Sequence, residues 1–136
     1  MSKVAVVYWS GTGNTQAMAE AVAQASQGTL LEASAFGAAQ VEAFDKFAFG
    51  CPSMGAEELE DSEFEPMFTA VKPLLAGKTI ALFGSYGWGD GEWMRIWEED
   101  CRQAGAILAT ESVICQETPD ADALAQCEAL GKALLQ

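Results

Sequence analysis

The sequence predicts an α/β fold in which a doubly wound, five-stranded parallel sheet carries helices on both faces. Short apolar runs of strand length alternate along the chain with segments of helical periodicity. Polar or glycine-rich loops follow several of the apolar runs, as they do at the ligand-binding edge of such sheets. The length of 136 residues fits one domain, residues 1–136, and no internal repeat or linker divides it.

The first half of the chain contains one clear helix and three predicted strands. Residues 14–26 place Met18 and Val22 on one apolar face, and we expect Gly28 to end this helix. The segment Phe36–Phe44 gives the weakest pattern. The predicted strands cover Lys3–Tyr8, Thr29–Ala33 and Lys46–Gly50.

The second half alternates helices and strands in the same way. Ser62 and Glu65 have the spacing of a capping box, which predicts a helix that begins here and runs to about Leu75. The elements that follow are a strand over Thr79–Ser85, a helix over Glu92–Ala104 with Trp93, Ile96, Trp97 and Cys101 at helical spacing, a strand over Ala106–Cys115, and a helix to Leu135 with Asp120 as its N-cap.

Composition excludes several classes of function. A net charge of −13 repels nucleic acid and anionic membrane surfaces, so we expect neither as a partner. No apolar run is long enough to cross a membrane, and the apolar run near the N-terminus is too short for a signal peptide, which predicts a cytoplasmic protein. The chain has no histidine and no C-x-x-C pair among its four cysteines, so we predict no metal site, reduced thiols and no catalytic residues of the common hydrolase types.

The loop after the first strand, Ser10-Gly11-Thr12-Gly13-Asn14-Thr15, concentrates hydroxyl groups and glycines before a helix. Glycine lets backbone N–H groups close on an anion, and a helix N-terminus supplies free donors. The loop has no Lys or Arg and matches neither GxxxxGK[ST] nor GxGxxG. An uncharged cradle for a phosphate monoester and an ordinary polar turn are both consistent with this loop taken alone.

Two further loops follow the third and fourth strands. Residues 52–58 combine Met54 with a glycine and two carboxylates, although a methionine taken alone is more often a packing residue. Residues 85–91 hold Tyr86 and Trp88 among three glycines, and an aromatic side chain in such a loop suits stacking on a planar ring. A lone loop tryptophan is also common as a surface packing residue.

Taken together, three stretches resemble the flavodoxin family, short-chain class. They are YWSGTGNT (Tyr8–Thr15), CPSMGAEELEDSEFEP (Cys51–Pro66) and LFGSYGWGDGEWM (Leu82–Met94). Flavodoxin is itself the standard example of a sheet of order 2-1-3-4-5 with FMN at its switch point. The resemblance therefore implies that strand order and one non-covalently bound FMN per chain, with FAD excluded.

The resemblance also implies a role for individual residues. Trp88 would stack on the outer face of the isoalloxazine ring, and Met54 would cover the inner face. Glu57 would accept a hydrogen bond from flavin N3–H. The Gly55 carbonyl would turn toward N5–H on one-electron reduction, and Ala56 stands next to it where relatives often carry a polar residue. The phosphate would be held by Ser10, Gly11, Thr12, Gly13, Asn14 and Thr15, and the remaining contacts would come from Ser53, Ser85, Tyr86, Gly87 and Gly89.

The implied function is that of a low-potential one-electron carrier that uses the semiquinone/hydroquinone couple, not an enzyme. Acidic residues cluster at positions 57–65 and 90–100, so we expect a monomer that docks on redox enzymes with basic faces. Two alternatives stay open at this point. One is an FMN-dependent NAD(P)H quinone or nitro reductase, and the other is a phosphate-binding regulatory module without flavin.

Overall fold

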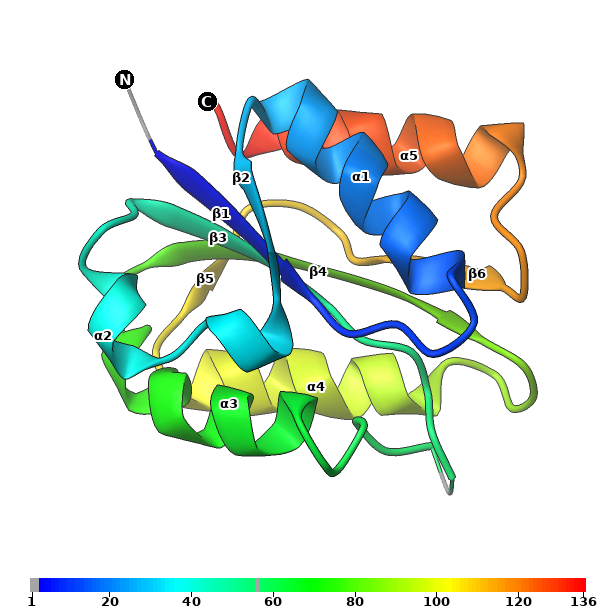
Figure 1. Cartoon of the computed structure of the whole chain (residues 1–136), viewed down its shortest axis with the longest axis horizontal. Helices are drawn as coiled ribbons and strands as arrows, with labels where there is room; N and C mark the ends of the chain where they lie inside the picture. The colour runs from blue at the N-terminus through cyan, green and yellow to red at the C-terminus, as the bar shows by residue number, and fades with distance from the viewer. Residues whose placement is uncertain (1–2, 56) are drawn as a thin grey trace.

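The computed structural model describes residues 3–55 and 57–136, which form one parallel sheet between two layers of helices (Figure 1). The sheet order is β2-β1-β3-β4-β5, and a further strand, β6, also pairs with β4. The predicted fold class and strand order are therefore confirmed. The strands are β1 (Val4–Tyr8), β2 (Thr29–Glu32), β3 (Lys46–Gly50), β4 (Thr79–Tyr86), β5 (Ile107–Leu108) and β6 (Val113–Gln116).

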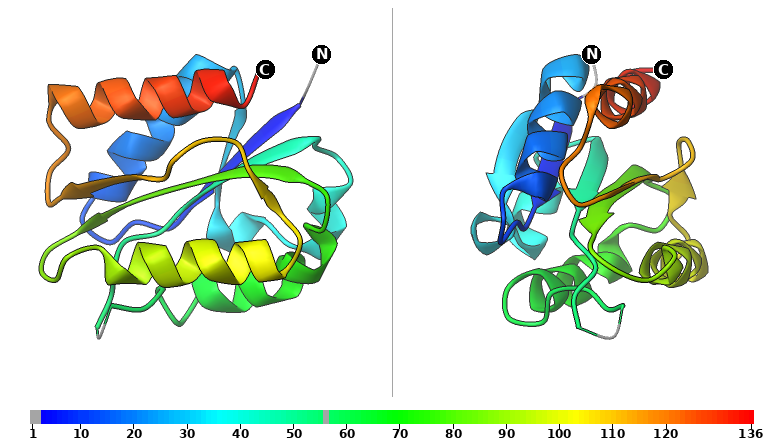
Figure 2. Two further views of the ribbon diagram at one scale, coloured as in Figure 1. Left: turned by 180° about the vertical axis from the view of Figure 1, so that it is seen from behind. Right: turned by 90° about the vertical axis from the view of Figure 1, so that its right-hand side faces the viewer.

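Two helices cover each face of the sheet. One layer contains α1 (Asn14–Ser26) and α5 (Ala121–Ala133), and the other contains α3 (Phe64–Val71) and α4 (Glu92–Gln103). Figure 2 shows the same two layers from two other sides. A short helix, α2 (Ala38–Val41), occupies the segment whose pattern was weakest.

Strand β1 shows why the sequence forms a buried central strand. All five of its residues are buried, as expected where helices cover both faces of a parallel sheet. Because side chains alternate along a strand, Val4 and Val6 pack in the cluster under α1 and α5, whereas Ala5 and Val7 pack in the cluster under α3 and α4.

The predicted fifth strand over Ala106–Cys115 is wrong as one continuous element. Its two ends, β5 and β6, both pair in parallel with β4, but the residues between them leave the sheet. Ala109 still donates its N–H to the Ile80 carbonyl at 2.8 Å, and the ladder resumes only at Val113. Ser112 instead donates its hydroxyl to the Glu98 carboxylate at 2.5 Å, which anchors the detour on α4.

Two predicted features of helix C-termini are corrected. The residue in the left-handed conformation after α1 is Gln27, with φ 55°, and not Gly28. Gly28 is instead needed for close packing, because a Cβ there would lie 2.9 Å from the Val4 carbonyl oxygen. The helix predicted to reach about Leu75 ends at Val71 and continues as one 3₁₀ turn that contains Pro73, which lacks the N–H that an α-helix requires.

The capping box predicted from Ser62 and Glu65 does not form. The buried Glu60 carboxylate takes its place, because it accepts backbone N–H groups of Glu63 and Phe64, each at 2.8 Å, and of Ser62 at 2.7 Å. Burial alone would raise the pKa of Glu60, but the hydrogen bonds from the Ser62 hydroxyl and from these three N–H groups outweigh it and lower the pKa. The start of α3 is therefore fixed by an ionised carboxylate. At the other end of the chain, Asp120 caps α5 as predicted, by accepting the Ala123 N–H at 2.8 Å.

Candidate functional site

A hollow of about 450 Å³ lies among the loops that follow the central strands. The carboxyl ends of these strands lie on the right-hand side of Figure 1. This is the edge at which doubly wound sheets bind ligands. The lining comes from the three predicted loops and from the loop after β6: Trp9, Gly11, Thr12, Asn14, Pro52, Ser53, Met54, Ser85, Tyr86, Gly87, Glu117 and Thr118. The structure thus brings together segments that lie more than a hundred residues apart in the sequence.

Some predicted site residues lie in these loops but outside the lining of the hollow. Ala56 lies outside the described residues. The predicted residues that lie in these loops but do not line the hollow are Ser10, Gly13, Thr15, Gly55, Glu57, Trp88 and Gly89.

The loop before α1 is built to leave backbone donors free. Gly13 is the N-cap with φ 93°, a conformation that favours glycine, and no side chain caps the helix. The Ser10 hydroxyl accepts the Gly13 N–H at 3.0 Å and folds the loop back on itself. The first turn of α1 has no acidic residue. An uncapped N-terminus on a helix of 13 residues is a site that favours an anion.

A buried pair of hydroxyl groups joins the first turn of α1 to the end of β4. Thr15 and Ser85 are both buried, and their side-chain oxygens lie 3.1 Å apart. Ser85 also accepts the Ser53 N–H through its backbone carbonyl at 3.0 Å. The three predicted loops are therefore held together by hydrogen bonds centred on Ser85.

The loop after β3 closes into a tight turn. Met54 and Glu58 exchange two backbone hydrogen bonds of 2.8 Å, one in each direction. Gly55 has φ 52° and Glu57 has φ 57° inside this turn. No atom lies within 4 Å of where a Cβ on Gly55 would be, so the turn has room there. Met54 is 38% exposed at the edge of the hollow, which is unusual for a residue that only packs.

Glu57 reaches from this turn to the beginning of α4. Its carboxylate accepts the Glu92 N–H at 3.1 Å. A Cβ on Gly89 would lie 2.6 Å from the Glu57 carboxylate, and the φ of 89° at this position favours glycine whatever the space. One Glu57 carboxylate oxygen has this partner, and the other remains able to accept a hydrogen bond from a ligand.

The loop after β4 presents its aromatic residues differently. Tyr86 lines the hollow and packs on Trp93 with ring centroids 5.5 Å apart, whereas Trp88 is 63% exposed. Two hydrogen bonds from the end of β6 hold the loop: the Gln116 side chain donates to the Gly87 carbonyl at 3.2 Å, and the Glu117 N–H donates to the Tyr86 carbonyl at 2.7 Å. Trp88 is therefore carried on an anchored loop without being buried itself.

The sequence analysis missed four residues that line the hollow. Trp9 forms part of its wall and donates its indole N–H to Glu63 at 3.1 Å. Pro52 immediately precedes the predicted contact Ser53. Glu117 and Thr118 follow the last strand. The rule that points to loops after parallel strands would have found this last pair if it had been applied to every strand.

The charge around the hollow is negative or neutral. No lysine or arginine is among the described residues that line it. The carboxylates of Glu57, Asp90 and Glu92 all lie within 4.8 Å of one another beside it. Burial raises the pKa of Cys51, at the end of β3, to about 12, so this thiol stays protonated at neutral pH. The site therefore offers hydrogen bonds and apolar surface but no nucleophilic thiolate.

These features define a class of protein: a doubly wound α/β protein with a site for a flavin mononucleotide. An uncharged helix N-terminus suits a phosphate, and the Met54 and Trp88 loops flank the space where a planar ring would extend from it.

Comparison with known proteins agrees with this class. The sequence model of the family described as Flavodoxin matches residues 6–131. The chain is 44% identical over 135 residues to a flavodoxin of Megasphaera elsdenii, with 96% of each chain covered, and 41% identical over 132 residues to a flavodoxin of Clostridium beijerinckii, with 93% and 95% covered. The solution structure of two-electron reduced Megasphaera elsdenii flavodoxin superposes with a TM-score of 0.88 at 43% identity, over 96% of this chain and 97% of that one.

The chain belongs to the flavodoxin family. It is an FMN-binding electron carrier and not an enzyme, and its partners are redox enzymes. The reductase alternative and the flavin-free alternative are not favoured. None of the described helices is long and apolar enough to cross a membrane.

Proposed function

We propose that Ser10–Thr15 hold the phosphate of FMN at the N-terminus of α1. The observation that carries this proposal is the uncapped start of α1, which faces the same hollow as the other two loops. A dianionic phosphate can accept the free N–H groups of the first turn and the hydroxyls of the loop. Flavin bound there supplies the one-electron chemistry, and the protein holds and tunes it.

The ring would extend from the phosphate between Met54 and Trp88. The side chains of Met54 and Trp88 are both exposed and neither belongs to the core. This supports their assignment to the inner and outer faces of the ring. Glu57 would accept the ring N3–H with its second carboxylate oxygen, while the Glu92 N–H holds the first. The remaining predicted contacts, including Ser53, Ser85 and Gly87, would surround the ring and its sugar alcohol chain.

The site's charge supports a low working potential. Arg95 pairs with Asp90 at 3.0 Å, but no ion pair is found for Glu57 or Glu92 among the described residues, so these two carboxylates disfavour additional negative charge on a ligand beside them. We therefore propose that the second one-electron reduction has the lower midpoint potential and is the working couple.

Partner choice follows from the same charge. We propose that the acidic residues of positions 57–65 and 90–100 dock on basic faces of redox enzymes, and that the chain acts as a monomeric single domain. All four cysteines are free, which supports a reducing, cytoplasmic compartment.

The phosphate assignment is tested by Asn14→Asp, measured as the affinity of the apoprotein for FMN and for riboflavin. Asn14 is the first residue of α1 and lines the hollow. A negative charge there favours the helix but repels a phosphate, so the fold is kept while FMN affinity falls about tenfold or more. Riboflavin, which lacks the phosphate, should bind as it does to the wild type.

Asn14→Ala is the matched control, because it shortens the side chain without adding charge. It should weaken FMN binding much less than Asn14→Asp does. Equal losses for FMN and riboflavin in Asn14→Asp would place the phosphate elsewhere. Chromatography of the cofactor released by heat should show FMN and no FAD.

A further inference from the structure

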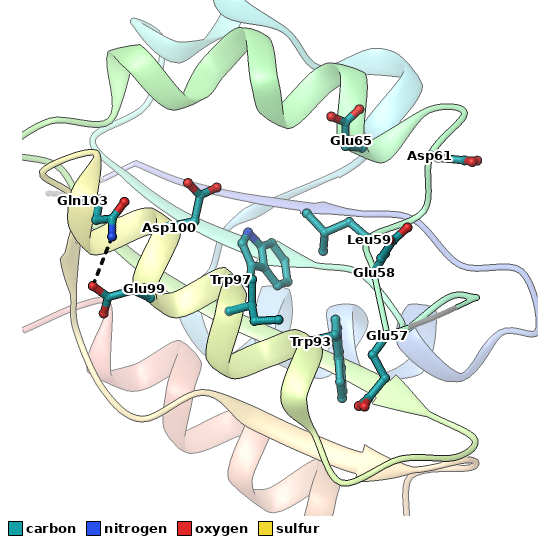
Figure 3. Close-up of a pocket in the computed structure, with 11 residues that line it drawn as sticks. Glu57, Glu58, Leu59, Asp61, Glu65, Trp93, Trp97, Glu99, Asp100 and Gln103 are labelled. Carbon is teal, nitrogen blue, oxygen red and sulfur yellow. Dashed lines mark hydrogen bonds between the residues drawn. The ribbon is translucent and has the colours of Figure 1, made fainter.

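We propose that a second, larger hollow receives a basic segment with an apolar anchor from an electron-transfer partner. This hollow, the α3–α4 groove, has a volume of about 790 Å³ and lies between α4 and the chain from Glu57 to Glu65 (Figure 3). It is separate from the flavin hollow, since the two share no lining residue. The inference rests on the proposed function in one respect, which is that the occupant is a redox partner.

The floor of the groove is apolar and partly unprotected. Leu59, Trp93, Ile96 and Trp97 line it. Ile96 is 59% exposed, although its spacing with Trp93 and Trp97 predicted a buried position. An exposed isoleucine beside two tryptophans offers apolar surface that an apolar side chain of a partner would cover.

Trp97 lies behind the floor of the groove and packs against α3, with ring centroids 5.4 Å from Phe64 and 5.7 Å from Phe68. Its side chain is 2% exposed, and its indole N–H has no acceptor among the described residues. The nitrogen-bearing edge of the ring is turned toward α3 (Figure 3). Because this nitrogen is itself buried, Trp97 supports Ile96 from behind and does not offer a hydrogen bond to an occupant of the groove.

Carboxylates form both rims of the groove. Glu58, Asp61 and Glu65 lie on the α3 side and are exposed. Glu99 and Asp100 lie on the α4 side (Figure 3).

Local cations compensate this charge only in part. Lys72 pairs with Asp100 at 3.0 Å, and Arg102 lies 4.0 Å from Glu99. Both pairs involve carboxylates of α4, and no ion pair is found for Glu58, Asp61 or Glu65 among the described residues. The α3 rim therefore keeps its negative charge.

This combination selects the chemistry of the occupant. Two acidic rims repel an anionic membrane, a nucleic acid and a second copy of this chain, which carries the same net charge of −13. An apolar floor does not suit a purely ionic ligand. A protein segment with an apolar side chain between lysines or arginines matches both rims and floor, because the apolar anchor is buried while the charges stay at the edge.

The groove also lies next to the flavin site. Trp93 forms part of the groove and packs on Tyr86, which lines the flavin hollow. Glu57 lines the groove and belongs to the same turn as Met54. A segment bound in the α3–α4 groove would therefore hold the rest of its protein beside the flavin loops.

The test is a titration of the FMN-loaded, isotope-labelled protein with two synthetic peptides, followed by NMR. Both are amidated twelve-residue peptides rich in lysine, one with two leucines a helical turn apart and the other with serines in their place. The leucine peptide should bind about tenfold more tightly, because burial of one leucine side chain accounts for a change of that size. Its shift changes should centre on Leu59, Trp93 and Ile96.

Variants of exposed residues test the floor and the rims separately. Ile96→Ser should remove most of the advantage of the leucine peptide and leave the serine peptide unaffected. Glu65→Gln combined with Glu99→Gln should weaken both peptides about threefold, as expected for exposed charges. Glu128→Gln, an exposed change on α5 across the sheet, is the matched control and should alter neither.

Equal affinity of the two peptides, shift changes outside the groove, or an unchanged leucine-peptide affinity in Ile96→Ser would overturn the proposal. The failure of the proposed function looks different. A wild type that binds FMN with two separate midpoint potentials but not the leucine peptide overturns the groove alone. A wild type that binds the peptide but not FMN overturns the proposed function and leaves the groove as a binding surface.

Discussion

Gly55 is the residue at which a substitution should most directly hinder rotation of the backbone carbonyl in the Met54 turn. It has φ 52°, and no neighbour lies within 4 Å of where its Cβ would be, so space does not limit the side chain and backbone conformation does. A β-branched residue resists positive φ. Gly55→Val should therefore strain the turn and hinder rotation of the carbonyl at position 55.

The expected result of Gly55→Val is a smaller separation between the two one-electron midpoint potentials, measured by stepwise dithionite titration. Gly55→Asn is the control, because asparagine tolerates the left-handed region better than other residues with a Cβ. It should leave the separation closer to that of the wild type. An unchanged separation in Gly55→Val would mean that this carbonyl does not respond to reduction.

Trp88 gives a second prediction at the scale of one residue. Because its side chain is 63% exposed, Trp88→Ala should leave the thermal unfolding of the apoprotein nearly unchanged. FMN affinity should fall about tenfold, because ring stacking contributes about 0.5–1.5 kcal/mol beyond the burial of area. Trp88→Phe should recover part of the loss. Unchanged FMN affinity in Trp88→Ala would remove Trp88 from the site.

The residues of the site were predictable to different degrees. Gly13 and Gly89 could be singled out from composition, and the structure supplies the reasons, which are a positive φ and the approach of Glu57. The wall residue Trp9 could not, because its role depends on a hydrogen bond to Glu63, 54 positions away. Long-range pairing of this kind leaves no local pattern in a sequence.

At the scale of elements, α3 depends on one carboxylate upstream of its first turn. Glu60 is 4% exposed and its pKa is lowered by the hydrogen bonds it accepts. A carboxyl group whose pKa is lower in the folded state stabilises the fold above its unfolded pKa and loses that effect as the pH falls through its folded pKa. The stabilisation by Glu60 should therefore be complete at neutral pH and disappear in acid, below the ordinary pKa of 4.5.

Glu60→Gln should thus lower the free energy of unfolding by about 1 kcal/mol at pH 7. The difference from the wild type should shrink as the pH falls below 4.5, as measured by denaturant unfolding with saturating FMN. Glu58→Gln, an exposed change two residues away, should show no such pH-dependent difference. A gap between Glu60→Gln and wild type that stays constant with pH would contradict the capping role.

Elements with a strong local signal were predicted best. The ranges 14–26 and 46–50 are confirmed as α1 and β3 to the residue. The range 106–115 was wrong because its apolar pattern does not show that Ser112 pairs with Glu98 and takes the chain out of the sheet. Ile96 was misplaced because helical periodicity places it beside Trp93 and Trp97, but no element covers that part of α4.

At the scale of the whole molecule, the charge is distributed unevenly about the sheet. The helix layer of α3 and α4 carries the acidic rims of the α3–α4 groove, and the same side holds the Glu57, Asp90 and Glu92 carboxylates beside the flavin loops. The order β2-β1-β3-β4-β5 is what brings these segments to one edge. Under our proposals, one surface would therefore combine the site of electron exchange with the charges that select partners.

This arrangement predicts that salt raises the lower midpoint potential. Exposed carboxylates near the site disfavour added negative charge, and ions screen such charges over about 10 Å at 0.1 M ionic strength. Dithionite titrations at low and high salt should show the lower midpoint potential rising with salt.

A change of one local charge tests the same cause. Glu92→Gln should raise the lower midpoint potential at low salt, because Glu92 is exposed beside Glu57. Glu128→Gln, on α5, makes the same change in net charge away from the site and should have a smaller effect. If the two variants shift the potential equally, net charge and not the local cluster sets it. A wild type that accepts both electrons in one step would contradict the one-electron carrier itself.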